Sequence, residues 1–215
     1  MIRGLYTIAD RGARPQGSLS ELARAYLEGG AEIVQLRMKC ASDASKTSDA
    51  SKVEREAREI MRLKDEFDFT FIVNDFVDVA LEVGADGVHV GATDEAVDSI
   101  RARAGRSVVI GYSSHSPEEA LRAQDSGADY VALGAIYPSP TKGPGHPVQG
   151  AARLREAVGS LERPVVAIGG IGRGNLDEVL STGASAVAMI SALAGAPDVV
   201  AETRWFVERL RRYDG

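Results

Sequence analysis

Eight short apolar segments alternate with longer amphipathic segments along the 215-residue chain, and this alternation limits the possible folds more than any other feature of the sequence. The apolar segments are rich in β-branched residues and almost continuously hydrophobic, as expected for strands that are buried on both faces. The amphipathic segments have the spacing of helices that bury one side. The predicted strands are residues 2–8, 33–36, 69–73, 87–90, 108–110, 130–133, 165–168 and 186–190.

One predicted helix follows each strand, and this order indicates an all-parallel α/β fold. A Gly-Ala-x-x-Val junction leads into every second strand, at residues 30–34, 84–88, 127–131 and 183–187. We expect its glycine to end the preceding helix in a left-handed conformation. The predicted helices are residues 19–28, 53–67, 77–83, 95–104, 118–126, 152–158, 176–182 and 199–213.

The short connections favour a single (βα)8 TIM barrel with all-parallel strands over residues 1–215. This length is near the lower end of the roughly 200 to 250 residues that are usual for such barrels. An open, doubly wound sheet is the alternative. One connection, after the second strand, is longer and repetitive: Ser-Asp-Ala-Ser-Lys occurs twice, at residues 42–46 and 48–52. This composition predicts a solvated polar loop over residues 40–52, which is also placed to act as a lid over the barrel mouth.

Composition excludes several classes of protein. The formal net charge is -6, with acidic and basic residues interspersed, which argues against nucleic acid as a partner. The one cysteine, Cys40, cannot form an intrachain disulfide. The N-terminal segment does not have the pattern of a signal peptide, and no apolar run approaches the roughly 20 residues that span a bilayer. We therefore expect a cytoplasmic globular protein without a membrane partner; the sequence leaves a homo-oligomer open.

A cationic group is predicted at the end of the second strand. The active site of a (βα)8 barrel lies at the C-terminal ends of its strands. Gln35, Arg37 and Lys39 alternate with apolar residues there, so a strand would point all three side chains the same way. Lys142, after the sixth strand, is a further candidate. Arginine and lysine suit phosphate groups, so we expect a multiply charged anion such as a diphosphate. Surface ion pairing is the alternative.

Two aspartates follow neighbouring strands and predict a metal site. Asp75 comes directly after the third strand and Asp94 shortly after the fourth, so their carboxylates are expected to converge. Two carboxylates, with substrate phosphate oxygens and waters, are a common way to hold Mg²⁺. Each aspartate has a structural alternative as a helix N-cap.

A second phosphate site is predicted where the seventh and eighth strands end, in Gly169-Gly170 and Ile190-Ser191. Barrels often bind phosphate there through backbone N–H groups. His115 follows the fifth strand and is a candidate acid or base, whereas His89 lies within the fourth strand and is expected to be a satisfied core or mouth residue.

Together, these segments resemble the thiamine-phosphate synthase family over nearly the whole chain. The resemblance is carried by the order and spacing of short motifs. They are Gln35-Leu36-Arg37-x-Lys39, Asn74-Asp75-x-x-Asp78, Ala85-Asp86-Gly87-Val88-His89-Val90-Gly91-x-x-Asp94, Ser113-x-His115-Ser116, Gly127-Ala128-Asp129-Tyr130-Val131, Pro138-x-x-Thr141-Lys142 and Ala167-Ile168-Gly169-Gly170-Ile171.

The resemblance implies a Mg²⁺-dependent transferase that joins 4-amino-2-methyl-5-pyrimidinylmethyl diphosphate to a thiazole phosphate and releases pyrophosphate by a dissociative mechanism. It implies that Asp75 and Asp94 hold the metal, and that Arg37, Lys39, Ser113 and Lys142 are catalytic. The implied pyrimidine diphosphate site is Gln35, Leu36, Arg37, Met38, Lys39, Asn74, Ser113 and Lys142. The implied thiazole phosphate site is Ser139, Pro140, Thr141, Gly170, Ile190 and Ser191.

Three other functions remain open at the level of the sequence. A thiazole tautomerase, which is similar to this family, would use His115 for proton transfer, but such relatives tend to lack the diphosphate and metal ligands that are present here. A non-catalytic barrel that binds a phosphorylated ligand is the second alternative. The third is another phosphate-binding barrel enzyme, because a fold alone does not define a function.

Overall fold

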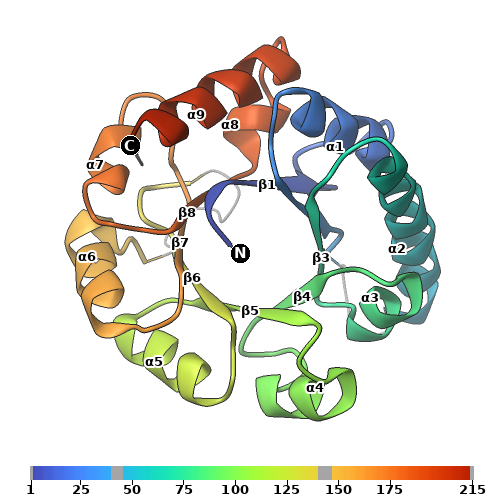
Figure 1. Ribbon diagram of the computed structural model, residues 1–215, viewed down its shortest axis with the longest axis horizontal. Coiled ribbons are helices and arrows are strands. Elements are labelled where there is room, and N and C mark those ends of the chain that lie inside the picture. The colour runs from blue at the N-terminus through green and yellow to red at the C-terminus, as the bar shows by residue number, and fades with distance from the viewer. Residues whose placement is uncertain (1, 40–45, 140–146, 214–215) are drawn as a thin grey trace.

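A closed barrel of eight parallel strands forms the centre of the molecule, with helices around it (Figure 1). The structure is a computed structural model that describes residues 2–39, 46–139 and 147–213. The strands are paired in chain order, and β1 closes the barrel by pairing with β8, so the predicted TIM barrel is confirmed. The strands are β1 (Gly4–Asp10), β2 (Ile33–Arg37), β3 (Thr70–Asn74), β4 (Gly87–Val90), β5 (Val109–Ser114), β6 (Tyr130–Gly134), β7 (Val165–Ile168) and β8 (Ala186–Met189).

All eight predicted helices are present, and those at 19–28, 77–83 and 199–213 have the predicted bounds. A short helix, α8, was not predicted. The helices are α1 (Leu19–Glu28), α2 (Lys46–Met61), α3 (Val77–Val83), α4 (Val97–Ala104), α5 (Pro117–Asp125), α6 (Gly150–Ser160), α7 (Leu176–Leu180), α8 (Ser191–Ala194) and α9 (Val199–Tyr213), with a 3-10 helix, η2 (Arg62–Asp65), after α2.

The glycines of the four repeated junctions have the predicted left-handed backbone. Gly84 has a φ of 73° and ends α3, while its N–H bonds to the last turn of that helix. Gly30, Gly127 and Gly183 also have positive φ values, of 90°, 99° and 83°. Each therefore lets the chain leave a helix and turn into the next buried strand at little steric cost.

The prediction of a loop over residues 40–52 is wrong for its second half, because α2 begins at Lys46. This half contains no glycine or proline to stop a helix. It also extends the apolar face of α2, since Ala50 packs against the core in line with the buried Val53, Ala57 and Ile60. Residues 40–45 lie outside the described residues, so the lid stays a prediction for that part.

Side chains alternate along the strands between the barrel interior and a shell beneath the helices. In β1, Tyr6 and Ile8 point into the barrel, and Leu5 and Ala9 point to the helices. Both layers are well buried, so the strand faces are apolar on both sides, as their composition predicted. Several polar residues, such as Asp10, Asn74 and Ser114, lie at the carboxyl ends of the strands.

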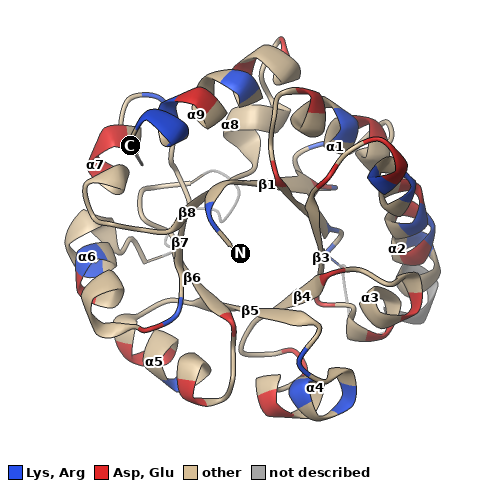
Figure 2. Ribbon diagram, viewed as in Figure 1, with Lys and Arg blue, Asp and Glu red and all other residues tan. Residues whose placement is uncertain are grey.

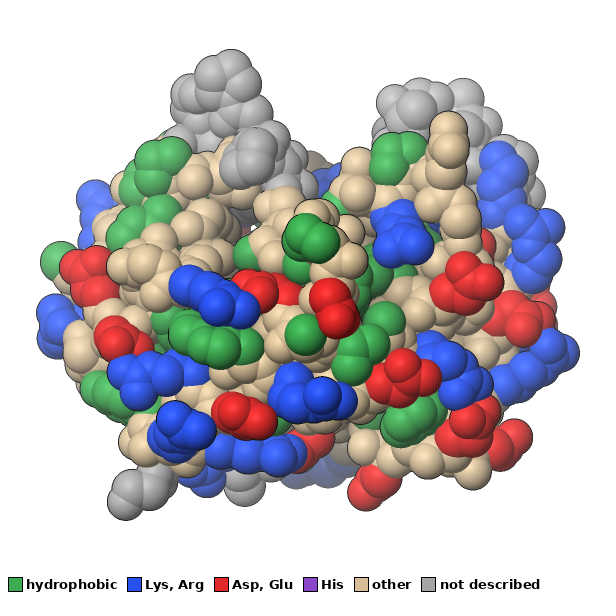
Figure 3. Space-filling view, turned by 90° about the horizontal axis from the view of Figure 1, so that it is seen from above, with side chains coloured by type: hydrophobic (Ala, Val, Ile, Leu, Met, Phe, Trp, Pro, Cys, Tyr) green, Lys and Arg blue, Asp and Glu red, His purple; other side chains and the backbone are tan. Residues whose placement is uncertain are grey.

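Charged residues lie mainly on the outer helices (Figure 2). Figure 3 shows one side of the molecule, where positive and negative side chains are interspersed and no large patch has a single sign. Many of them form surface ion pairs; Arg209 with Asp177 and Arg173 with Glu202 connect α9 to α7 and to the segment before it. Among the described helices, none is both long and apolar enough to cross a bilayer.

Candidate active site

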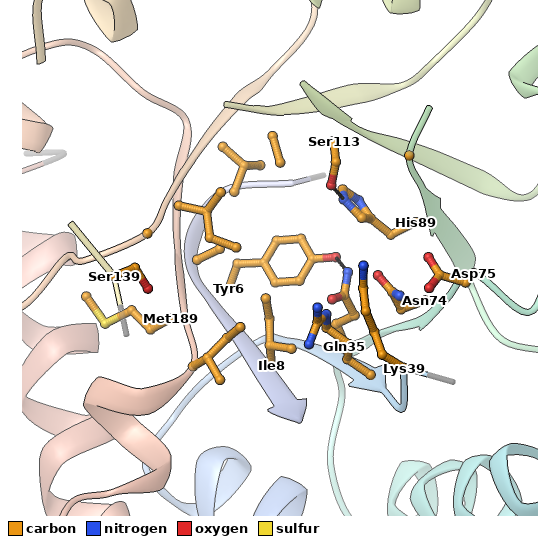
Figure 4. Close-up of a pocket in the computed structure, with 18 of the residues that line it drawn as sticks. Tyr6, Ile8, Gln35, Lys39, Asn74, Asp75, His89, Ser113, Ser139 and Met189 are labelled. Carbon is orange, nitrogen blue, oxygen red and sulfur yellow. Dashed lines mark hydrogen bonds between the residues drawn. The ribbon is translucent and has the colours of Figure 1, made fainter. Parts of the chain in front are cut away.

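A cavity of about 290 Å³ opens at the carboxyl ends of the strands, where the sequence predicted the site. Figure 4 shows Gln35, Lys39, Asn74 and Asp75 on one side of this cavity and Ser139 on the other, with Tyr6 between them. Most of the predicted residues in the described part of the chain meet here. The cavity is lined by Gln35, Arg37, Lys39, Asn74, Asp75, Asp94, Ser113, His115, Ser139, Gly170, Ile190 and Ser191, among others.

Five predicted residues are not among those that line the cavity. Lys142, Pro140 and Thr141 lie outside the described residues, so their roles stay predictions. Leu36 and Met38 alternate with the cationic residues of β2 and therefore face the opposite way. Leu36 is fully buried beneath the helices, and Met38 packs against the same core. Leu36 and Met38 therefore do not line the cavity.

Asp10, at the end of β1, belongs to the site but was missed by sequence reasoning. Its carboxylate is buried, pairs with the guanidinium of Arg37, and accepts a hydrogen bond of 2.8 Å from the N–H of Ala13. The first strand was predicted to end at Ile8, whereas β1 continues to Asp10 and pairs there with Arg37. A polar residue two positions after the predicted strand was the available signal. Asp10 holds Arg37 at the cavity wall.

Asp75 and Asp94 converge, as predicted. Burial, the negative charge of Asp94 and a hydrogen bond with it raise the pKa of Asp75 to about 6, while Lys39 and Arg37 act in the opposite direction. Asp94, Lys39 and Arg37 therefore all lie within electrostatic reach of Asp75. Asp75 also has a φ of 64°, which is uncommon for a residue with a Cβ.

Neither aspartate serves as a helix N-cap, so that structural alternative is not supported. The N-cap of α3 is Phe76 and that of α4 is Ala96, and neither helix has a side-chain cap. Asp94 instead accepts a hydrogen bond of 2.8 Å from the N–H of Gly91 through Oδ2. Among the described residues, no group of three or more histidine, cysteine, aspartate or glutamate side chains is arranged to hold a metal. Two carboxylates are nonetheless enough for Mg²⁺ when phosphate oxygens and waters complete the shell.

The opposite side of the cavity is formed by the ends of β7 and β8. Gly169 and Gly170 have φ values of 101° and 67°. A Cβ on Gly170 would lie only 2.5 Å from the carbonyl oxygen of Pro138, so the backbone passes closely here. Ile190 and Ser191 line the same side at the start of α8. This side has far fewer charged groups than the side that holds Lys39 and Asp75.

A buried chain of hydrogen bonds crosses the floor of the cavity. Gln35 Nε2 donates to the Tyr6 hydroxyl at 3.0 Å, and the hydroxyls of Tyr6 and Tyr130 are 2.7 Å apart. His89 continues the chain, with Nδ1 2.9 Å from the Tyr130 hydroxyl and Nε2 2.8 Å from Ser113 Oγ. His89 is thus a satisfied mouth residue, as expected. The tyrosines were not predicted; alternation along β1 and β6 was the only signal that they point inward.

His115 stands at the edge of the cavity and is partly exposed. Its Nδ1 lies 3.5 Å from Glu119 Oε2, and the same oxygen accepts a hydrogen bond of 2.7 Å from the His115 N–H. The carboxylate of Glu119 thus lies beside the imidazole, and the role of His115 as an acid or base stays a prediction.

Comparisons with known proteins identify the family of this chain. A family model described as thiamine monophosphate synthase matches residues 5–193. A thiamine-phosphate synthase from Methanoregula boonei is 44% identical over 207 residues, which are 96% of this chain and 92% of the relative. Another from Pyrococcus furiosus is 42% identical over 208 residues, which are 97% of this chain and 93% of the relative.

The solved structure of a thiamine phosphate pyrophosphorylase from Pyrococcus furiosus superposes with a TM-score of 0.86 at 38% identity, covering 99% of this chain and 97% of the other. A (S)-3-O-geranylgeranylglyceryl phosphate synthase from Thermoplasma acidophilum shares the fold alone, with a TM-score of 0.66 at 16% identity over 98% of this chain and 94% of the other. The length, identity and coverage of the matches leave one conclusion: this chain belongs to the thiamine-phosphate synthase family of transferases.

Proposed function

We propose that this enzyme condenses 4-amino-2-methyl-5-pyrimidinylmethyl diphosphate with a thiazole phosphate in a Mg²⁺-dependent, dissociative reaction. The C–O bond between the pyrimidine methylene and the diphosphate breaks, and its electron pair leaves with the pyrophosphate. The lone pair of the thiazole nitrogen then forms the new C–N bond. These two bond changes require neither a proton transfer nor a nucleophile from the protein.

The observation that carries the proposal is the grouping of Arg37, Lys39, Asp75 and Asp94 at one end of the cavity. A diphosphate leaving group gains negative charge as its bond breaks. Cations that are already in place stabilise that charge in the transition state without having to reorganise. Asp10 supports this arrangement because it fixes the guanidinium of Arg37.

Asp75 and Asp94 are the residues that would hold Mg²⁺. Their donor set fits a hard cation that prefers oxygen ligands, and burial together with the negative charge of Asp94 raises the pKa of Asp75, which a cation beside both carboxylates would counteract. A bound metal would supply positive charge beside the leaving group. The other end of the cavity, with Gly170, Ile190 and Ser191, has few charged groups among the described residues and leaves room for the second phosphorylated substrate at a distance from these charges.

The test is thiamine phosphate and pyrophosphate formation from the two precursors, with and without Mg²⁺, in wild type and in Asp75→Ala. We expect Mg²⁺-dependent product and a loss of about 100-fold or more in the variant, since even outer-sphere partners of bound metals are worth about 10- to 100-fold. Asp98→Asn is the matched control, because Asp98 is exposed on α4 and away from the cavity. A folded wild-type protein that forms no product would refute the proposal.

The placement of His115 beside Glu119 at the cavity edge favours thiazole tautomerisation as the second candidate function. If the condensation were absent, conversion of the thiazole tautomer by wild type and its loss in His115→Asn would establish this alternative. Survival of that activity in Asp75→Ala would separate it from the condensation reaction.

A further inference from the structure

The chain Gln35–Tyr6–Tyr130–His89–Ser113 connects the two parts of the expected pyrimidine diphosphate site through the barrel interior. Tyr6, Tyr130, Gln35 and His89 are all buried, with exposed fractions of 1%, 0%, 3% and 6%. Buried hydroxyl and imidazole groups are costly unless each finds a partner, so the donors and acceptors of such a chain must match along its whole length.

Counting the protons leaves few possible directions for the hydrogen bonds along this chain of side chains. Burial raises the pKa of both Tyr6 and Tyr130 above the ordinary value, so each hydroxyl keeps its single proton. Gln35 Nε2 donates to Tyr6, which leaves the Tyr6 proton for Tyr130. With one proton on the imidazole of His89, the Tyr130 proton goes to Nδ1 of His89, and Nε2 donates to Ser113 Oγ.

This direction leaves the proton of Ser113 available to a ligand. The opposite direction, with the Gln35 amide reversed, would use that proton on His89 and turn the lone pairs of Ser113 toward the cavity. An anionic ligand discriminates between the two, because phosphate oxygens accept hydrogen bonds and repel lone pairs. In the favoured direction, the Gln35 amide oxygen also remains an acceptor for a donor such as an amino group.

We propose that Tyr130 and His89 are positioning residues that fix the proton of Ser113 toward the diphosphate and, through the same chain, fix the amide of Gln35 toward the pyrimidine. The inference rests on the proposed function and goes beyond it by assigning roles to two residues at the base of the site. The rings are fixed as well as the protons: His89 stacks on Tyr130 with ring centroids 5.5 Å apart and an interplanar angle of 29°. Neither Tyr130 nor His89 needs to touch the reacting atoms.

Tyr130→Phe removes the central hydroxyl and keeps the ring. We expect kcat/KM for the pyrimidine diphosphate to fall by about ten- to a hundredfold, the range for a lost hydrogen bond to a charged group. The KM for the thiazole phosphate is expected to stay within about twofold of wild type. Tyr26→Phe is the matched control: Tyr26 is also fully buried and its hydroxyl donates to Ile8 O at 3.4 Å, but it belongs to the buried face of α1 and does not line the cavity.

A double-mutant cycle separates positioning from general support of the fold. If Tyr130 acts through Ser113, adding Tyr130→Phe to Ser113→Ala lowers kcat/KM by less than about twofold further. Effects that simply multiply would overturn the coupling, and so would a Tyr130→Phe enzyme that behaves like the Tyr26→Phe control. If Tyr130→Phe does not keep the wild-type circular dichroism spectrum, Tyr6→Phe breaks the same chain and replaces it in the cycle.

The wild-type enzyme in the same assay distinguishes the two proposals. Absence of thiamine phosphate in the wild-type reaction would refute the function on which the inference rests. Product formation by wild type with multiplicative effects in the cycle would refute the hydrogen-bonded coupling alone.

Discussion

Asp75 bears three separate costs in the described structure. It is largely buried, its φ of 64° lies in the left-handed region, and the carboxylate of Asp94 is close enough to raise its pKa. A left-handed non-glycine residue alone costs on the order of 1 to 3 kcal/mol. Costs of this kind concentrate at functional sites, where a ligand that is bound in the working state repays them. A cation between the two carboxylates would offset the two electrostatic costs together.

The pKa of Asp75, raised to about 6, predicts how Mg²⁺ should stabilise the protein. Above this pH the side chain is ionised and able to bind the cation; below it, protons compete with the metal. We therefore expect the Mg²⁺-induced rise in Tm to be large well above pH 6 and to shrink as the pH falls through that value. Thermal unfolding at saturating Mg²⁺ and in chelator, at a series of pH values, measures the difference.

In the metal-free protein, the contribution of Asp75 to stability changes with pH in the opposite direction. The pKa of Asp75 in the folded state exceeds the value of about 3.9 in an unfolded chain, so the folded state binds a proton more tightly. This residue accordingly lowers stability as the pH rises from about 4 to about 6 in chelator. Asp75→Asn serves as the control, because it removes the titrating group. A Mg²⁺ effect that was the same in Asp75→Asn as in wild type would place the metal elsewhere.

The sequence predicts well which segments form helices and which form strands, and it predicts less well where each of them begins and ends. Continuous apolar segments located every strand, because a parallel sheet buries both faces. The end of β1 was missed because Asp10 interrupts the apolar pattern, although β1 still pairs with β2 at that point. The four-residue helix α8 was not predicted, since a segment that short has no periodicity to detect. Such boundaries depend on pairing and packing between distant segments, which the local sequence pattern does not show.

Helix α9 packs closely against the end of α1, and this contact contains a polar defect. A Cβ on Gly29 would lie 2.5 Å from the Cβ of Thr203, which measures how near the two helices are. Thr203 is fully buried, and its Oγ1 has no hydrogen-bond partner among the described residues. An unsatisfied buried hydroxyl costs about 1 to 3 kcal/mol.

Thr203→Val replaces this hydroxyl with a methyl group of similar shape, so we expect the free energy of unfolding to rise by about 1 kcal/mol. Urea denaturation with an unchanged m-value measures it. Thr182→Val is the matched control with the opposite expected sign, because the buried Thr182 hydroxyl donates to Val179 O at 2.6 Å. Its loss should cost about 1 kcal/mol. A destabilised Thr203→Val protein would mean that the hydroxyl of Thr203 has a partner after all.

For the whole molecule, the closed barrel explains why much of the site was predictable. Closure brings the carboxyl ends of all eight strands to one mouth, so any polar residue directly after a strand becomes a candidate. This rule found Lys39, Asp75 and Asp94. It could not find the residues one layer deeper, such as Tyr6 and Tyr130, because their contacts cross the barrel between strands that are distant in sequence. Their hydrogen bonds depend on how the interior is filled.

That filling depends on Gly111 of β5, which faces the Tyr130 ring. A Cβ on Gly111 would lie 2.0 Å from Tyr130 Cζ, and the Tyr130 ring is fully buried. We expect Gly111→Ala to lower the free energy of unfolding by about 1 to 3 kcal/mol, the usual cost of overpacking a core. It should also reduce condensation activity, because the displaced ring can no longer link Tyr6 to His89.

Gly159→Ala in α6 is the control: a Cβ there meets nothing within 4 Å, so the protein should be stabilised by up to about 1 kcal/mol. Urea denaturation and the condensation assay on both variants check this, and a Gly111→Ala protein as stable and active as wild type would show that the barrel interior is not closely packed around Tyr130.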